Sequence, residues 1–182
     1  HPHGLTLSKG KQPQIWDDIK TGDKRACLNA PEFLAAMHRL VMAPPALDPD
    51  YPLLLNTTCR TKANMNTLYR NEKWIEKNMP ENTLTMHAED AAARGITDKE
   101  RVRISSRNGS AEVPVSLTTD ILPGTVFLSH GWGLYSRDPQ DRSGTQRGVA
   151  AGLFVSDEDG DEFSGMPLYN GIPCSVTKLG SR

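Results

Sequence analysis

The hydrophobic pattern of this 182-residue chain changes at a proline-rich segment that spans residues 43–49. Before this segment, apolar residues recur at helical spacing only between Glu32 and Val41, so we predict one brief helix there. The three prolines within the segment disfavour regular structure and indicate a linker. We therefore expect residues 1–48 to be an irregular lead-in segment and linker, and residues 49–182 to form the main domain.

After the linker, short apolar runs and alternating stretches replace the helical spacing, and they predict six strands. Asn108-Gly109 is a strong signal for a hairpin turn between two of them, and Pro114 is expected near an edge or bulge. Many short strands with few helices indicate a compact β-barrel. The predicted strands are residues 52–58, 83–86, 101–105, 111–117, 125–128 and 172–176.

Two short helices are predicted within the barrel sequence. One passes through Trp74 and Ile75, and Asn66-Thr67 could cap it. The other runs from Ala88 to Arg94, with acidic residues in its first turn and Gly95 as its stop. We interpret His87, just before this helix, as a cap or surface residue and not as a catalytic base.

Composition and charge exclude several classes of partner. With 21 Lys and Arg against 22 Asp and Glu, the chain has no excess charge to attract nucleic acid, and no apolar run is long enough to enter a membrane. Cys27, Cys59 and Cys174 are isolated from one another and predict neither a disulfide framework nor a metal or iron–sulfur site. We expect a cytoplasmic location, with the periplasm as the alternative. The opening residues, without Met or a signal-peptide pattern, suggest a fragment or a processed chain.

A series of motifs in the main domain resembles the carboxy-terminal domain of the dimethyl sulfoxide reductase family, the molybdopterin-dependent oxidoreductases. The resemblance extends from Leu53 to Thr177. It implies a mainly β fold with short helices: a six-stranded double-psi β-barrel of the aspartate decarboxylase-like type. The motifs are Thr57-Thr58-Cys59-Arg60, Asn64-Met65-Asn66-Thr67, Met86-His87-Ala88-Glu89-Asp90-Ala91-Ala92-Ala93-Arg94-Gly95-Ile96, Leu122-Pro123-Gly124-Thr125-Val126, His130-Gly131-Trp132-Gly133 and Ser164-Gly165-Met166-Pro167-Leu168-Tyr169-Asn170-Gly171.

The same resemblance implies that this domain covers one side of a bis-molybdopterin guanine dinucleotide cofactor that carries Mo or W. Two loops, one after the first strand and one after Leu128, would meet at one barrel mouth facing the cofactor. Arginine can bind a phosphate, amides and hydroxyls can bind the pterin edge, and glycine allows close backbone approach. The candidate cofactor-binding residues are Thr58, Cys59, Arg60, Asn64, Asn66, Thr67, His130, Gly131, Trp132, Gly133 and Asn170.

Several of these residues also have a purely structural interpretation, which the sequence leaves open. His130 could hold a loop turn, Trp132 could serve packing, and Asn66 could be a helix cap. We interpret Cys59 as a small buried hydrophobe and not as a metal ligand. The family often has Gly at position 59, His at 64 and Asn-rich sequence around Ala150 and Gly152, and each lost amide costs about 1 kcal/mol of binding. The sequence leaves open how tightly, or whether, the chain holds its cofactor.

The leading functional interpretation is a binding domain that forms one wall of the cofactor site in a formate dehydrogenase, nitrate reductase, or S- or N-oxide reductase. Its partners would be the preceding domains of the same enzyme and the pterin dinucleotide. The isolated chain would be inactive and would lack the cofactor, and the sequence does not select the substrate. The alternative is a double-psi barrel that serves as a protein-interaction or adaptor module and no longer binds a pterin. Such an adaptor has no reason to keep the loop 130–133. A free-standing hydrolase or decarboxylase ranks last, because no convincing nucleophile and base are paired in the sequence.

Overall fold

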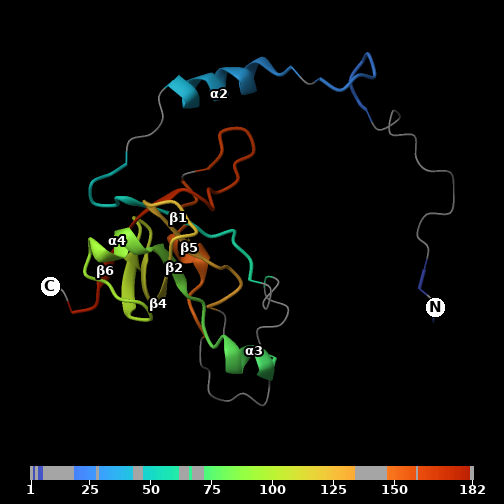
Figure 1. Cartoon of the computed structure of the whole chain (residues 1–182). Coiled ribbons are helices and arrows are strands. Elements are labelled where there is room, and N and C mark those ends of the chain that lie inside the picture. Colours follow the sequence, from blue (N-terminus) through green and yellow to red (C-terminus); the bar gives the residue numbers. More distant parts are fainter. Residues whose placement is uncertain are drawn as a thin grey trace. The chain divides into compact units, whose positions relative to one another are not determined.

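A computed structural model of the chain describes residues 2, 4–5, 19–27, 29–42, 47–61, 66, 72–133, 147–158 and 160–180. By its contacts, the chain separates into two units, residues 1–46 and residues 47–182. In the first unit, helix α2 (Pro31–Met42) confirms the predicted helix (Figure 1). Glu32 in the first turn and Arg39 in the last turn complement the helix dipole. No helix among the described residues is long and apolar enough to cross a membrane.

The second unit is built around a closed barrel in the order β1-β5-β2-β4-β3-β6 (Figure 1). Strands β1 and β5 are parallel, as are β2 and β4, and the remaining neighbours are antiparallel. This arrangement is a six-stranded double-psi β-barrel, so the predicted fold class is confirmed. The strands are β1 (Leu53–Asn56), β2 (Leu84–His87), β3 (Arg101–Ser105), β4 (Ser110–Thr118), β5 (Thr125–Leu128) and β6 (Ile172–Lys178).

The predicted hairpin is present between β3 and β4, with Ser105 paired to Ser110 across the turn. Pro114 lies opposite Arg101 in this pairing, and the pairing of β4 with β2 begins one residue later, at Val115. A proline has no N–H to donate to a ladder. Because Pro114 lies just before the pairing of β4 with β2 begins, its missing N–H is compatible with the closed sheet.

The barrel core is formed by the inward-facing residue of each alternating pair along the strands. Leu55, Leu84, Val102 and Val126, for example, are fully buried. Phe154 is also fully buried in this core, although it comes from the short 3₁₀ helix η1 (Ala151–Phe154) and not from a strand. None of the strands and helices predicted from the sequence includes Phe154, so its contribution to the core was not predicted.

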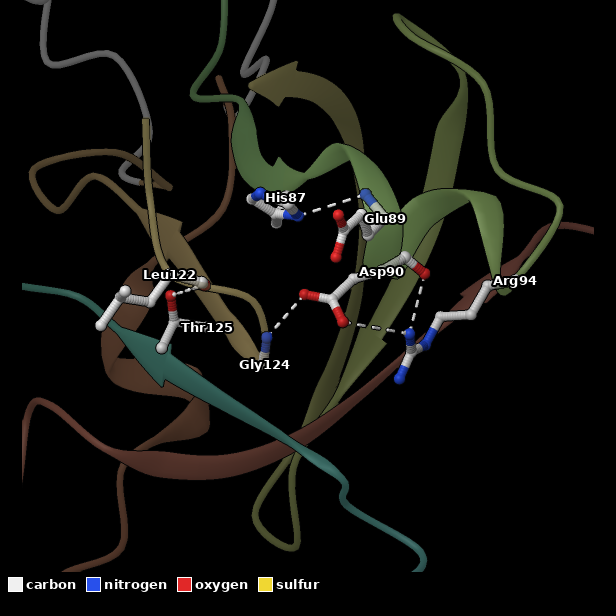
Figure 2. Close-up of polar contacts among 7 residues, drawn as sticks. All are labelled: His87, Glu89, Asp90, Arg94, Leu122, Gly124 and Thr125. Atoms are coloured by element: carbon white, nitrogen blue, oxygen red, sulfur yellow. Dashed lines mark hydrogen bonds and ion pairs between the residues drawn. The ribbon is translucent and has the colours of Figure 1, made fainter. Parts of the chain in front are cut away.

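Helix α4 (Ala88–Ala92) connects two parts of the barrel through polar contacts (Figure 2). His87 caps the helix, because its Nδ1 accepts a hydrogen bond from the N–H of Glu89 at 3.2 Å. Asp90 accepts a 2.7 Å hydrogen bond from the N–H of Gly124, in the turn before β5. The predicted cap is confirmed, and Gly95 has the positive φ of 63° expected of a helix stop.

Helix α3 (Lys73–Asn78) confirms a short helix around Trp74 and Ile75, but its predicted cap is wrong. Glu72 occupies the N-cap position and makes no side-chain capping bond. Asn66 lies six residues earlier, with a φ of 71°, and its side chain contacts His130 instead. An asparagine that tolerates the left-handed region also suits a loop, so residue type alone did not distinguish the two roles.

The burial of the three cysteines predicts a large difference in their thiol reactivity. Cys27 is exposed, whereas burial raises the pKa of Cys59 and raises that of Cys174 to about 12. Because the thiolate is the reactive form, iodoacetamide at pH 8 should modify Cys27 first, Cys59 more slowly and Cys174 only after unfolding. Mass spectrometry of peptides from native and urea-treated protein measures this order. Equal rates at Cys27 and Cys174 in the native protein would contradict the barrel core.

Candidate functional site

Residues from four separate segments surround one cavity in the second unit, which we call the rim cavity. The segments are the loop after β1, the loop after β5, the start of η1 and the residues before β6. The cavity has a volume of about 460 Å³, which is in the usual range for a small-molecule site. It is lined by Thr57, Thr58, Arg60, His130, Gly131, Trp132, Ala150, Ala151, Gly152 and Tyr169.

Asn170 connects the loop after β1 to the chain segment before β6. Its Oδ1 accepts hydrogen bonds from the N–H groups of Thr57 and Thr58, at 3.2 and 3.3 Å, and from the Thr58 hydroxyl at 2.9 Å. The Thr57 hydroxyl also donates to the carbonyl of Tyr169 at 2.7 Å. Asn170 therefore uses its acceptor to fix the loop, and the sequence predicted its nearness to the site but not this role.

His130 connects the loop after β5 to the loop after β1 at the rim cavity. One ring nitrogen, Nδ1, lies 3.2 Å from the carbonyl oxygen of Thr57, and Nε2 lies 2.6 Å from Oδ1 of Asn66. The imidazole is thus engaged by protein groups on both sides. This geometry favours the role of holding the loop, and it also places His130 in the cavity wall.

Trp132 lines the rim cavity and carries a buried donor. The residue is 2% exposed, and its indole Nε1 has no hydrogen-bond partner among the described residues. A buried donor without a partner costs about 1–3 kcal/mol, so such groups usually mark the position of a missing acceptor. A ligand with an oxygen or ring-nitrogen acceptor would satisfy it, as a pterin or a phosphate would.

Arg60 gives the rim cavity a positive charge. The residue is exposed, and within the described part of the chain its guanidinium forms no ion pair or hydrogen bond. An arginine in this state retains its donors for a bidentate contact with an anion. Together, Arg60 and the Trp132 indole form a donor set that fits the phosphates and ring edge of a pterin dinucleotide.

Glycine occupies positions 131 and 133, after His130, for two different structural reasons. Both have positive φ, 89° at Gly131 and 76° at Gly133, and only Gly131 lines the cavity. A Cβ at Gly133 would lie 2.1 Å from the backbone nitrogen of Ala150. Close approach at Gly133 is therefore to the chain itself, and it brings residues 150–152 against the loop after β5.

Asn82 is a buried residue of the site that the sequence analysis missed. Its Nδ2 donates to the carbonyls of Ser129 and Val149, at 2.9 and 3.0 Å, and its Oδ1 accepts from the N–H of Val149 at 2.9 Å. The side chain is 1% exposed. It thus fixes both loops that flank Trp132. A lone asparagine before a strand resembles an ordinary turn residue, so no sequence pattern indicated this role.

The structure brings together five of the predicted binding residues around the rim cavity: Thr58, Arg60, His130, Gly131 and Trp132. Ala150 and Gly152 line it too, so the positions where the resemblance led us to expect Asn-rich sequence are at the site. Of the other predicted binding residues, Asn64 and Thr67 lie outside the described residues. Cys59 lines a neighbouring groove instead. Among the described residues, no group of three His, Cys, Asp or Glu side chains could hold a metal ion.

Comparison with known proteins identifies the family. The model of the family described as "Molydopterin dinucleotide binding domain" matches residues 53–173, more than half of the chain. A formate dehydrogenase from Methanococcus maripaludis, "F420-dependent formate dehydrogenase 2 subunit alpha", is 35% identical over 85 residues, 46% of this chain and 12% of that protein. Trimethylamine-N-oxide reductase of Haemophilus influenzae is 48% identical over 46 residues, 25% of this chain and 6% of that protein. The chain thus spans only a small part of the length of these relatives.

A solved structure agrees with the fold. Acetylene hydratase from Pelobacter acetylenicus matches with a TM-score of 0.59 at 21% identity, over 70% of this chain and 18% of that one. At this identity the likeness concerns the fold alone, and it supports the double-psi barrel. The matched residues 53–173 contain every described residue that lines the rim cavity. The chain therefore belongs to the molydopterin dinucleotide binding domain family, as its resemblance to the dimethyl sulfoxide reductases indicated.

Proposed function

We propose that this chain forms one wall of a binding site for a molybdopterin guanine dinucleotide that carries Mo or W. The observation that carries the proposal is the buried indole N–H of Trp132, which has no partner among the described residues, at a cavity that Trp132 and Arg60 both line. The family match supplies the class of ligand, and these two donors fit its chemistry. The chain alone would then bind part of the cofactor without catalysing a reaction.

Residues at and around the rim cavity would have two roles, because some would bind the ligand and others would hold the loops in place. Arg60 would bind a phosphate, the Trp132 indole would donate to an acceptor of the ligand, and the Thr58 hydroxyl lies on the same wall. His130, Asn66 and Asn170 would hold the loops in place, through the hydrogen bonds described above. The bound metal cofactor would supply the redox chemistry, which no described residue of this chain provides.

The parent reaction would be oxygen-atom transfer, or hydride and electron transfer, on a small substrate. Two relatives are named as a formate dehydrogenase subunit and a trimethylamine-N-oxide reductase. Both names denote enzymes that catalyse reactions of these kinds. Residues 1–48 would be the lead-in segment from a preceding domain, and residues 49–182 the binding domain. The preceding domains of the same enzyme would complete the site and supply any ligand to the metal.

Titration with neopterin, a soluble pterin, tests the proposal on the 182-residue chain. Because only one wall is present, we expect a dissociation constant on the order of 1 mM. The ¹H–¹⁵N resonance of the Trp132 indole should shift with the amides of Thr58 and Gly131. Trp132→Phe keeps an aromatic ring but removes the donor, and it should weaken binding about fivefold.

Trp74→Phe is the matched control, because Trp74 is 52% exposed on α3, away from the lining of the rim cavity. It should leave neopterin binding unchanged. Shifts confined to residues outside the rim cavity, or an equal affinity for Trp132→Phe and the native chain, would overturn the proposal. A barrel without any pterin binding would instead suit an adaptor module.

A further inference from the structure

The sequence contains two Asn-Gly pairs, and the structure places them in different hydrogen-bonding environments. Asn108-Gly109 forms the turn between β3 and β4, and Asn170-Gly171 lies directly before β6. An asparagine followed by glycine is especially prone to spontaneous deamidation, because glycine has no side chain to keep its backbone nitrogen away from the asparagine amide carbon. Both asparagines are exposed, so exposure alone does not distinguish the two pairs.

Deamidation requires that the backbone nitrogen after the asparagine is free to react. This nitrogen attacks the side-chain amide carbon and forms a C–N bond, and the amide nitrogen leaves as ammonia with the proton of the glycine N–H. Water then opens the resulting five-membered imide at either carbonyl and yields aspartate or isoaspartate. The reaction consumes one water molecule, releases one ammonia and requires no enzyme or cofactor.

Asn170-Gly171 is held by hydrogen bonds in an unreactive arrangement. The N–H of Gly171 donates to Oδ1 of Asn56 at 3.1 Å. Oδ1 of Asn170 accepts the three hydrogen bonds from Thr57 and Thr58 described above. These bonds must break before the glycine nitrogen can reach the amide carbon, so each of them raises the barrier to the reaction.

Asn108-Gly109 lacks both of these restraints. Within the described part of the chain, the N–H of Gly109 donates no hydrogen bond and Oδ1 of Asn108 accepts none. The side-chain amide of Asn108 donates one long bond there, 3.4 Å from Nδ2 to the carbonyl of Phe154. Glycine is also required at this position, because a Cβ at residue 109 would lie 2.7 Å from the carbonyl oxygen of Leu153. A bulkier residue therefore cannot replace Gly109 to slow the reaction.

We propose that Asn108 is a site of spontaneous deamidation, and that its conversion loosens the attachment of η1 to the turn between β3 and β4. In the unmodified protein, the carbonyl of Phe154 accepts from the Asn108 amide and, at 3.1 Å, from the Ser106 hydroxyl. A carboxylate at position 108 cannot donate to this carbonyl and repels it, and isoaspartate also lengthens the backbone of the turn. Ala151 and Gly152 of η1 line the rim cavity, so the modification would alter that wall. The inference does not rest on the proposed function, because each contact that carries it lies within the chain.

Incubation of the 182-residue chain at pH 8 tests the first part of the proposal, with peptide mass spectrometry to follow deamidation at each asparagine. We expect Asn108 to deamidate at least about tenfold faster than Asn170, because the hydrogen bonds around Asn170 raise its barrier. Asn170-Gly171 is a matched internal control, since the dipeptide is identical. In urea that unfolds the chain, the two rates should become similar. A native chain in which Asn108 is modified no faster than Asn170 would overturn the proposal.

Asn108→Asp, which carries the side chain of one product, tests the effect on η1. It should shift the amide resonances of Leu153, Phe154 and Val155 and lower the melting temperature of the barrel by about 3 °C. Asn29→Asp adds the same charge at an exposed residue of the first unit, and it should change neither property. Asn108→Gln keeps an amide but would have to close a larger ring, so it should prevent modification of the turn. An Asn108→Asp chain with native η1 resonances and a native melting temperature would overturn the proposed link to η1.

Discussion

Replacing Phe154 with alanine is expected to lower the free energy of unfolding by about 3–5 kcal/mol. Phe154 is fully buried, and it packs into the barrel core from η1 together with residues such as Ile104 and Val113. Removing the ring loses its transfer free energy and leaves a cavity that the surrounding strands cannot fully close. Urea unfolding followed by circular dichroism measures the change.

Phe163→Ala is the matched control for this prediction. Phe163 is the same residue type, but it is 42% exposed in the segment before β6, so its truncation should cost less than about 1 kcal/mol. The Phe154 variant should also weaken neopterin binding, because Ala151 and Gly152 of η1 line the rim cavity. Equal losses of stability in the two variants would show that η1 is not part of the core.

Much of the barrel could be predicted from the sequence because its strands are short and its core residues alternate with exposed ones. The alternation in β3 and β4 and the Asn108-Gly109 turn between them indicated the hairpin. Local patterns cannot, however, specify which strands pair across the chain. The parallel pairing of β1 with β5 was not predicted, because the family resemblance implied only the double-psi barrel as a fold class.

The parts of the site that were predicted differ from those that were missed in how far apart the contacting residues lie along the sequence. The loops around Arg60 and Trp132 were predicted because their motifs are contiguous in the sequence, and both line the rim cavity. Phe154 was missed because the short apolar run around it, residues 149–155, includes a glycine and shows neither helical nor alternating spacing. The predicted cap role of Asn66 was wrong because its partner, His130, lies 64 residues away in the sequence.

Small residues at 150–152 give the rim cavity its open wall. Ala150, Ala151 and Gly152 line the cavity and have no side-chain amides, whereas the family resemblance led us to expect Asn-rich sequence here. The lost amides leave the Trp132 indole and Arg60 as the main donors toward a ligand on this side. The position of this wall then matters more than its side chains, and Asn82 fixes that position through Val149.

Replacing Asn82 with alanine is expected to lower the free energy of unfolding by about 2–4 kcal/mol. The variant leaves the carbonyl of Ser129 and both backbone groups of Val149 without their side-chain partner. Buried polar groups that lose their partners carry the full cost of desolvation. Urea unfolding measures the loss, and the indole resonance of Trp132 reports whether the wall has moved.

Asn78→Ala is the control, because Asn78 is exposed and, within the described part of the chain, its side chain donates only to the Trp74 carbonyl of its own helix. It should cost less than about 1 kcal/mol. Gly148→Ala provides a second probe, since its new Cβ would lie 2.6 Å from Oδ1 of Asn82, at a residue with a φ of 65°. If Asn82 fixes the wall, both Asn82→Ala and Gly148→Ala should weaken neopterin binding, and Asn78→Ala should not. An Asn82→Ala chain that unfolds like the native protein and retains its neopterin affinity would mean that backbone contacts alone hold the wall.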